Sequence, residues 1–424
     1  MRLTIVGNPD NRRVTLFSAA VVAAGSLAPE VLPWRVVAAG EPFAFASGAL
    51  VRIESPGEDA EVRRLFTGGV AGHGEIVGGR AWYLGLCRAL GRLRAAADLA
   101  GATLLGDPAE IAVLFDKAAC HARLTAAGIP VPPALPTTGR VLARPAASAP
   151  RRDARPGTAT PGSGWEELRD ALDAVGWSRV FVKPRHGSSA SGVLALRRAP
   201  GRTWATTSVE LVRDGDRVRL FNSLRVRTYR DERDVAAIVD HLAPDGLHVE
   251  RWFPKAGLDG RTIDLRVLVL AGRPGHVVVR ASHSPMTNLH LGGTRGDLDA
   301  LRRAAGPDAY AAAMATCARV AAQFPGSPHV GVDLMFAPGW TRHAVAEVNA
   351  FGDLLPGLLV DGRDPYETQV AALRTRAGRL GTESVASGAP TSAGTPGVEA
   401  AALLPGAGTD ATSADVSSGR ESIR

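Results

Sequence analysis

The sequence predicts a mixed α/β protein with more than one domain. Its first hundred residues alternate short apolar strands with helical patterns, as a small parallel α/β domain does. Longer apolar strands recur at 264–270, 276–281 and 329–336, between helical segments. With 424 residues, 45% of them apolar, the chain can build two or three domains with cores of their own.

The N-terminal region opens with a strand, a turn and a helix. We expect strands at 3–6, 34–38 and 50–53 and helices at about 12–24 and 80–99. The glycines between Gly68 and Gly79 do not match G-x-G-x-x-G and follow no strand, so a flexible loop is favoured over a phosphate cradle.

Two helix starts follow this region. Asp107, Pro108 and Glu110 form an N-cap, a first-turn proline and a reciprocal acidic residue. Asp116 can cap a second helix and thereby presents Lys117 near the helix N-terminus. This helix ends at Gly128, and a proline-rich connector leads into residues 137–164, whose aperiodic Pro, Ala, Arg and Ser composition predicts an insertion outside the core.

The remainder again mixes both element types. We expect helices at 165–175, 231–242, 308–323 and 365–376, strands at 180–183, 193–197, 248–253, 264–270, 276–281 and 329–336, and alternating segments at 206–229. From residue 377 onward Gly, Ala, Ser, Thr and Pro dominate, which predicts a disordered tail at 377–424.

Composition excludes several classes of protein. No stretch approaches 18 uninterrupted apolar residues and the N-terminus enters a strand directly, so we expect no membrane span, no signal peptide and a cytoplasmic protein. The formal charge of +7 comes from scattered arginines without interleaved aromatics, which argues against nucleic acid. The cysteines, Cys87, Cys120 and Cys317, have no C-x-x-C spacing and are expected to be buried and reduced.

Lysine is rare in this basic chain. Of 49 Lys and Arg residues, only Lys117, Lys183 and Lys255 are lysine. A retained lysine indicates a position where a compact ammonium is needed and a planar guanidinium does not serve. All three are therefore candidate site residues.

Three oxygen ligands are expected on two neighbouring strands. Glu347 and Asn349 lie two residues apart in an alternating apolar run, so both point to one face, and Asp333 lies in the apolar run 329–336. Glu347 and Asn349 would be about 6.5 Å apart along a strand, which suits two Mg²⁺ ions about 3.5–4 Å apart with the glutamate between them. The alternative is a surface hairpin with incidental acidic residues.

A loop rich in small residues joins two expected strands at 180–183 and 193–197. Gly187, Ser188, Ser189 and Gly192 leave backbone N–H groups open to an anion, and Lys183 ends the preceding strand. Lysine comes before the glycines and strands flank both sides, so the loop is not a Walker sequence. A simple hairpin turn is the alternative.

The order of these pieces resembles the ATP-grasp superfamily. Over 116–353 the chain carries Asp-Lys, Lys-Pro with the Gly/Ser loop, Val-Glu-Arg-Trp-Phe, Asp-Leu-Arg, Thr-Asn-Leu-His-Leu-Gly-Gly, Gly-Val-Asp and Glu-Val-Asn. Among these proteins it is most similar to the RimK-type amino-acid ligases, and more distantly to D-alanine–D-alanine ligase and glutathione synthetase. The resemblance implies a pre-ATP-grasp domain of Rossmann-like type at 1–105 and an ATP-grasp domain at 106–376, with its lid at about 117–248 and its metal and catalytic part at 249–376.

The resemblance also implies residue roles. ATP phosphates would contact Lys117, Lys183 and the Gly/Ser loop, and the ribose hydroxyls would contact Asp264. Arg266 and Arg280 would stabilise the transferring phosphoryl group, and Asn288 would lie near the metals. The remaining expected roles are adenine recognition by the backbone of Glu250, Arg251, Trp252 and Phe253, and Mg²⁺ or Mn²⁺ coordination by Asp333, Glu347 and Asn349. For Lys255 and His290, a substrate contact and a purely structural role both stay open.

The activity implied is ATP-dependent ligation. Two metal ions and the lysines neutralise the ATP phosphates, a substrate carboxylate forms an acyl-phosphate and ADP, and an amine or a thiol then displaces phosphate. The substrates would be small molecules or peptides. The alternatives are a phosphotransferase of the same fold and a non-catalytic ATP-binding module.

The sequence departs from these relatives after Asn349. Phe351 and Asp353 replace a small residue and a proline beside the metal ligands, where the acceptor would bind. The insertion at 137–164 and the stretch 204–229 have no counterpart in the resemblance. The identity of the substrates is therefore not implied, and neither is the oligomeric state.

Overall fold

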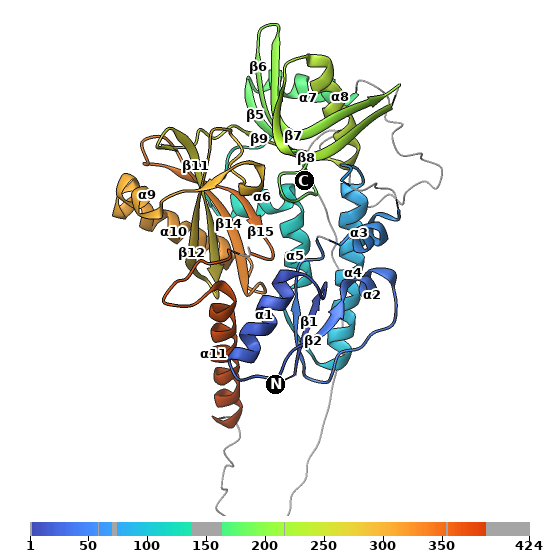
Figure 1. The fold of residues 1–424 in the computed structure, drawn as a ribbon, viewed down its shortest axis with the longest axis vertical. Coiled ribbons are helices and arrows are strands. Elements are labelled where there is room, and N and C mark those ends of the chain that lie inside the picture. Colours follow the sequence, from blue (N-terminus) through green and yellow to red (C-terminus); the bar gives the residue numbers. More distant parts are fainter. Residues whose placement is uncertain are drawn as a thin grey trace, which may run out of the picture. The chain divides into compact units, whose positions relative to one another are not determined.

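The computed structural model describes residues 2–57, 59–69, 74–136, 163–215, 217–352 and 355–386, with the backbone alone at 163 and 376–386. Residues 1–376 form one compact unit, whose described part contains three sheets (Figure 1). Nearly all of the insertion expected at 137–164, Asp353 and the tail beyond 386 lie outside the described residues. Within the described ranges, no helix combines the length and apolar character needed to cross a membrane.

The first sheet is parallel, with strand order β2-β1-β3-β4. Its strands are β1 (Leu3–Gly7), β2 (Glu30–Pro33), β3 (Leu50–Ile53) and β4 (Thr103–Leu105), and its helices are α1 (Arg12–Ala23), α2 (Trp34–Ala39), α3 (Ala60–Thr67) and α4 (Gly79–Ala100). Asn11 and Asp59 cap α1 and α3 by accepting backbone N–H groups. This confirms the expected parallel α/β organisation.

The strand expected at 34–38 is wrong. Residues 34–39 form helix α2, and the strand β2 directly precedes them at 30–33. Pro33 ends the strand and precedes the first helical turn, and the buried Trp34 and Val37 are three residues apart, which is helical spacing.

The second sheet is antiparallel, with order β8-β7-β6-β5-β9. Its strands are β5 (Arg179–Pro184), β6 (Leu194–Ala199), β7 (Arg202–Asp214), β8 (Arg217–Tyr229) and β9 (Leu247–Arg251). Helices α7 (Ser163–Ala174) and α8 (Glu232–Leu242), followed by the short turn η1 (Ala243–Asp245), complete this region. Trp165 from α7, Ile238 from α8 and Val182 from β5 share one hydrophobic core. The segment 74–76 joins β8 through Asn222 N–H to Gly74 O (2.9 Å) and Ile76 N–H to Leu220 O (2.8 Å).

The third sheet has the order β13-β12-β11-β14-β15, and β10 pairs with β11. Its strands are β10 (Gly257–Leu258), β11 (Arg261–Leu270), β12 (Arg273–Ser282), β13 (Thr294–Arg295), β14 (His329–Phe336) and β15 (His343–Asn349). Helices α9 (Leu298–Ala305) and α10 (Pro307–Ala322) pack against it, and the short turn η2 (Leu289–Leu291) follows β12. The strands expected here and the helix at 308–323 are confirmed, whereas α9 was not anticipated.

Two short helices connect these regions. Asp107 caps α5 (Pro108–Phe115) and Asp116 caps α6 (Lys117–Ala126), as the sequence predicted. Cys120 and Leu124 of α6 belong to the same core as Val345 and Val348 of β15. Helix α6 is thereby fixed against the third sheet, with Lys117 at its N-terminus. Cys120 and Cys317 are buried and free, but the free Cys87 is only half-buried.

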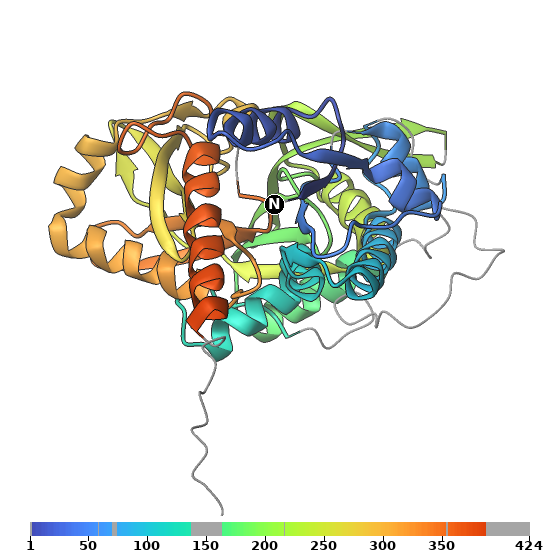
Figure 2. The same cartoon turned by 90° about the horizontal axis from the view of Figure 1, so that it is seen from below.

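The last helix is longer than expected. We expected it to end near Arg376, but α11 (Pro365–Ala386) continues for ten further residues, because Gly378 and Gly381 are isolated and single glycines are tolerated in a helix. Tyr366 and Val370 pack with Phe17 of α1 in a separate core, which places the start of α11 against the N-terminal region (Figure 2).

Candidate active site

All three lysines of the chain line one pocket. The pocket encloses about 750 Å³, its open mouth included, and lies where the second and third sheets and α6 meet. Among the residues predicted from sequence, it is lined by Lys117, Lys183, Gly187, Ser188, Glu250, Arg251, Phe253, Asp264, Arg280, Asn288, Asp333 and Glu347. The predicted residues that do not line it are Ser189, Gly192, Trp252, Arg266 and Asn349.

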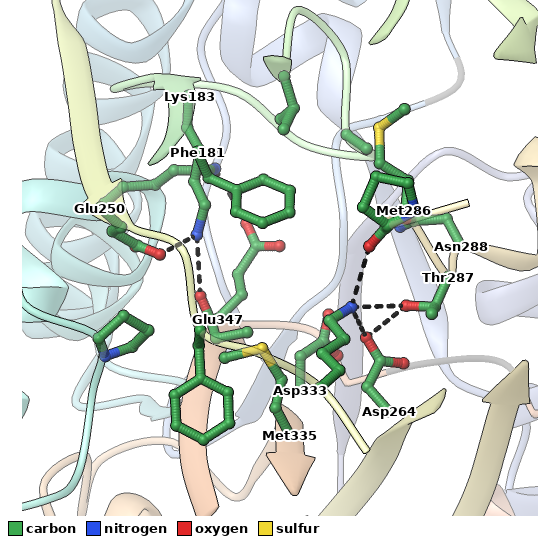
Figure 3. A pocket seen from close by; sticks show the side chains of 18 of the residues that line it. Phe181, Lys183, Glu250, Asp264, Met286, Thr287, Asn288, Asp333, Met335 and Glu347 are labelled. Atoms are coloured by element: carbon green, nitrogen blue, oxygen red, sulfur yellow. Dashed lines mark hydrogen bonds and ion pairs between the residues drawn. The ribbon is translucent and has the colours of Figure 1, made fainter. Parts of the chain in front are cut away.

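Each lysine faces a carboxylate across this pocket. Lys117 Nζ lies 2.9 Å from Glu347 Oε1, Lys183 Nζ lies 2.7 Å from Glu250 Oε2, and Lys255 Nζ lies 2.8 Å from Asp264 Oδ2. Figure 3 shows Lys183 and Glu250 on one side of the cavity and Asp264 and Thr287 on the other, with Glu347 and Asp333 between them. The scarcity of lysine indicated all three, and the resemblance implied that Lys117 and Lys183 meet at one ligand, but it left the place of Lys255 open.

The expected pairing of the two acidic strands is confirmed. β14 and β15 are antiparallel, with Asp333 opposite Glu347 and Gly331 opposite Asn349, so the three candidate oxygen ligands share one face. The register shifts between Asp333 and Leu334 because Ala346 is an extra residue on β15. The Ala346 carbonyl consequently accepts from Lys183 Nζ at 3.2 Å.

The electrostatics of this face suit a divalent cation. Burial raises the pKa of Asp333, and the nearby Glu347 acts in the same direction, against Arg266 and Arg280. Burial also acts to raise the pKa of Glu347, but Lys117 and Lys183 outweigh it, so the pKa is lowered. Two facing carboxylates and one amide oxygen form a hard donor set that fits Mg²⁺. Among the described residues, no group of three or more His, Cys, Asp and Glu side chains could hold a metal, so the set depends on Asn349.

The Gly/Ser loop is held in a defined shape. Ser189, Ala190 and Gly192 have positive φ, and a Cβ on Gly192 would come within 2.6 Å of Pro184 Cγ, so only glycine fits there. Lys117 Nζ donates to Gly187 O at 2.5 Å, and Ser208 Oγ donates to Ala190 O at 3.2 Å. The loop is therefore fixed from both α6 and β7.

The Gly/Ser loop also contacts the short turn η2. His290 Nε2 lies 3.0 Å from Ser189 O, so this histidine contacts the loop itself. Asn288, which precedes η2, lines the pocket nearby.

Two backbone N–H groups of the segment expected to bind adenine already donate hydrogen bonds to other parts of the protein. Arg251 N–H donates to Pro133 O (2.7 Å) and Trp252 N–H donates to Arg179 O (3.0 Å). The buried Glu250 accepts from Lys183 and shares a hydrogen bond with His248 (2.9 Å), and these partners outweigh burial to hold the pKa of Glu250 at about 2. Phe253 lines the pocket, so this end remains the candidate for the adenine ring.

Sequence reasoning missed the apolar lining of the pocket. Phe181, Met286, Thr287 and Met335 line it but were not predicted. A usable signal existed for two of them, since Phe181 precedes Lys183 by two positions on β5 and Met335 follows Asp333 by two on β14. Side chains two apart on a strand share a face, so both had to point into the site with their charged neighbours.

Phe351 does not project into the pocket. It is buried with its ring centroid 5.8 Å from that of Phe115, and its carbonyl accepts from Arg13 Nη1 of α1 at 2.8 Å. The large ring of Phe351 fills the core between β15 and α5. That the acceptor binds beside this residue stays a prediction. Asp353 lies outside the described residues.

Comparison with known proteins identifies the fold. No protein-family model matches the sequence, and no curated protein matches it. A D-cycloserine synthetase matches at 17% identity and TM-score 0.50, with 89% of this chain and 99% of that chain covered. A D-alanine–D-alanine ligase from Bacillus anthracis complexed with ATP matches at 12% identity and TM-score 0.43 (91% and 99% covered), and a RimK-domain ATP-grasp protein from Sphaerobacter thermophilus at 15% and 0.43 (88% and 98% covered). The chain therefore has the ATP-grasp fold that its sequence predicts.

Proposed function

We propose that this protein is an ATP-dependent ligase that activates a carboxylate as an acyl-phosphate and joins it to an amine or a similar nucleophile. The observation that carries the proposal is the meeting of all three lysines with four carboxylates, the buried Glu250, Asp264 and Asp333 and the partly exposed Glu347, in one pocket of an ATP-grasp fold. Lysine ammoniums, small-residue backbone and paired carboxylates together suit a bound triphosphate and its metal.

Each part of the pocket then has a role. The adenine ring would lie against Phe181, Phe253 and Met335, beside the 250–253 segment. The phosphates would contact Lys117, Lys183 and the loop containing Gly187, Ser188, Ser189 and Gly192. Asp333, Glu347 and Asn349 would hold Mg²⁺ or Mn²⁺, which withdraws charge from the phosphates when bound.

The reaction proceeds in two displacements. A substrate carboxylate oxygen attacks the γ-phosphorus, the bond to the β,γ-bridging oxygen breaks, and ADP leaves. The amine nitrogen then attacks the acyl carbon, the carbon–oxygen bond to phosphate breaks, and the nitrogen releases a proton to solvent. Arg280, which lines the pocket beside Asp333, would stabilise the charge on the transferring phosphoryl group, and Arg266, which does not line it, would act through Asp333. Asn288 would orient the substrate at the rim.

The domain division follows the same proposal. Residues 1–105 would form the pre-ATP-grasp domain, 117–248 the lid and 249–376 the catalytic part. The separate hydrophobic core that runs from Leu135 to Val249 supports a lid that packs as one body. In this core Leu135 lies near the end of the proline-rich connector and Val249 directly precedes the 250–253 segment.

The test is release of ADP and phosphate that depends on both a carboxylate and an amine. Purified protein is incubated with ATP, Mg²⁺ and mixed pools of amino acids and short peptides, and both products are quantified. Equal molar release of ADP and phosphate, only when an amine is present, supports ligation. ADP release with the phosphoryl group retained on a substrate would instead identify a phosphotransferase, and nucleotide binding without release would identify a binding module.

A further inference from the structure

Both carboxylate oxygens of Asp264 accept hydrogen bonds from protein donors on the pocket wall. Its side chain is 3% exposed. Oδ1 accepts from Arg280 Nε at 2.7 Å, and Oδ2 accepts from Lys255 Nζ at 2.8 Å and from Thr287 Oγ1. These partners hold the pKa of Asp264 well below its usual range against the effect of burial. A carboxylate with both oxygens so engaged has little capacity left for a sugar hydroxyl.

The partners of Asp264 connect it to the metal-ligand face. Arg280 uses Nε for Asp264 and places Nη2 3.1 Å from Asp333 Oδ2, and Arg266 Nε lies 2.8 Å from Asp333 Oδ1. The register sets this arrangement, since Asp264 lies opposite Arg280 on β12 and Arg266 lies opposite Asp333 on β14. The resulting charge network, defined as Lys255, Asp264, Arg280, Asp333 and Arg266, contains three cations and two carboxylates.

Lys255 is saturated in the same way. An ammonium has three donors, and Lys255 Nζ has three acceptors: Asp264 Oδ2, Thr287 Oγ1 (3.1 Å) and Pro285 O (3.3 Å). Lys117 and Lys183 differ, because each has two oxygen partners: Gly187 O and Glu347 for Lys117, Glu250 and Ala346 O for Lys183. Lys255 thus clamps Asp264 to the 285–287 segment.

We propose that Asp264 is a positioning residue that fixes Arg280 against Asp333, and that it does not read the ribose of the nucleotide. Lys255 and Thr287 hold the carboxylate in place. The carboxylate in turn fixes Arg280, whose Nη2 lies beside Asp333, where the terminal phosphate of the nucleotide would bind. This inference rests on the proposed function and assigns Asp264 a role other than the one implied by the sequence resemblance. It predicts that the ribose hydroxyls gain no affinity from Asp264 and that the Asp264–Arg280 pair matters only where the terminal phosphate lies.

The first experiment needs no variant. Affinities of the wild-type protein for ADP, 2′-deoxy-ADP and 3′-deoxy-ADP are measured by calorimetry with Mg²⁺. We expect all three to agree within about threefold. A carboxylate that read a hydroxyl would make one deoxy compound weaker by about tenfold or more, the effect of losing a hydrogen bond to a charged group.

The second experiment separates the two ends of the nucleotide. We expect Asp264→Asn to leave ADP affinity within about threefold and to weaken AMP-PNP binding about tenfold or more. In the double variant with Arg280→Lys, the AMP-PNP loss should be no larger than in Arg280→Lys alone, because Asp264 acts through Arg280. Glu250→Gln is the matched control at the other lysine–carboxylate pair, and it should weaken ADP and AMP-PNP equally.

The outcomes distinguish the inference from the proposed function. Failure of the wild-type protein to bind any adenine nucleotide would overturn the proposed function and this inference with it. Binding of ADP with a tenfold preference over either deoxy form would overturn the inference alone, as would additive losses in the double variant. If Asp264→Asn does not fold, as judged by its thermal transition, Thr287→Val takes its place in the same comparison and the wild-type deoxy-nucleotide result still decides.

Discussion

The two walls of the pocket hold their charges differently. On the β5–β9 wall, Lys183 faces Glu250, and His248 completes a small buried group. On the β11–β14 wall, three cations share two carboxylates in the charge network defined above. In the first wall the described residues supply acceptors for two of the three Lys183 donors, whereas in the second they supply acceptors for all three donors of Lys255.

This difference suggests that the β5–β9 wall binds the nucleotide and that the β11–β14 wall holds side chains in a fixed position. A cation with a remaining donor can exchange protein contacts for a phosphate oxygen without losing all of its partners. A network of mutually engaged charges keeps its geometry before any ligand arrives, which is how a site is preorganised. We therefore expect perturbations of the β5–β9 wall to change nucleotide affinity, and perturbations of the β11–β14 wall to change stability and phosphoryl transfer.

The largest effect is expected at Glu347, which lies between the walls. Glu347→Gln keeps the volume but removes the charge that faces Lys117, so Mg²⁺-dependent ADP release should fall by about 100-fold or more, a loss of several kcal/mol in the transition state. The same variant should lose the Mg²⁺-dependent tightening of AMP-PNP binding. Glu210→Gln, at a partly exposed carboxylate paired with Arg227, is the control and should behave as wild type. Normal turnover of the Glu347 variant at saturating Mg²⁺ would contradict the metal assignment.

The walls should differ in their contribution to stability. Arg280→Met leaves Asp264 and Asp333 buried without their shared cation, which should lower the free energy of unfolding by about 3–5 kcal/mol. Lys183→Met should lower it less, by about 1–3 kcal/mol, because Glu250 keeps His248. Urea unfolding at pH 7 measures both. Equal losses would show that the network is no more tightly coupled than the single pair.

The Glu250 group predicts a pH-dependent contribution to stability. Its pKa is about 2 in the folded protein, below its ordinary 4.5, because Lys183 and His248 outweigh burial. A lowered pKa stabilises the fold above the unfolded value, and that stabilisation is lost as pH falls from about 4.5 to about 2. The stability difference between wild type and Glu250→Gln should therefore be about 3 kcal/mol larger at pH 7 than near pH 2. Urea titrations across this window test it, and a constant difference would disprove the linkage.

The smallest effect compares two conservative lysine changes. Lys183→Arg should weaken ADP binding about tenfold, because a planar guanidinium cannot replace a compact ammonium between Glu250 and the Ala346 carbonyl. Lys255→Arg should change ADP affinity less than about threefold, since all three acceptors of Lys255 are protein groups. Calorimetric titration decides, and equal effects would remove the distinction between the walls.

Much of the fold followed from local pattern. The alternating strands and helices of the N-terminal region, the caps at Asp107 and Asp116, and the pairing of the two acidic strands could be predicted because they depend on spacing of two or 3.6 residues and on capping chemistry. The segment after Pro33 was misassigned because short apolar runs have similar composition in strands and helices.

The sequence by itself determined which residues are candidates for the site. The scarcity of lysine and the Asp, Glu-x-Asn and Gly/Ser patterns indicated seven residues that line the pocket: Lys117, Lys183, Lys255, Gly187, Ser188, Asp333 and Glu347. The resemblance to the ATP-grasp superfamily added six more: Glu250, Arg251, Phe253, Asp264, Arg280 and Asn288. Tertiary structure alone decided how they are paired. The extra residue at Ala346 turns its carbonyl to Lys183, and the register of β11 against β12 and β14 joins Asp264 to Arg280 and Arg266 to Asp333. Such pairings link residues far apart in the chain. Side-chain periodicity within one strand decides which residues share a face, but it does not by itself say which partner residue lies opposite each of them.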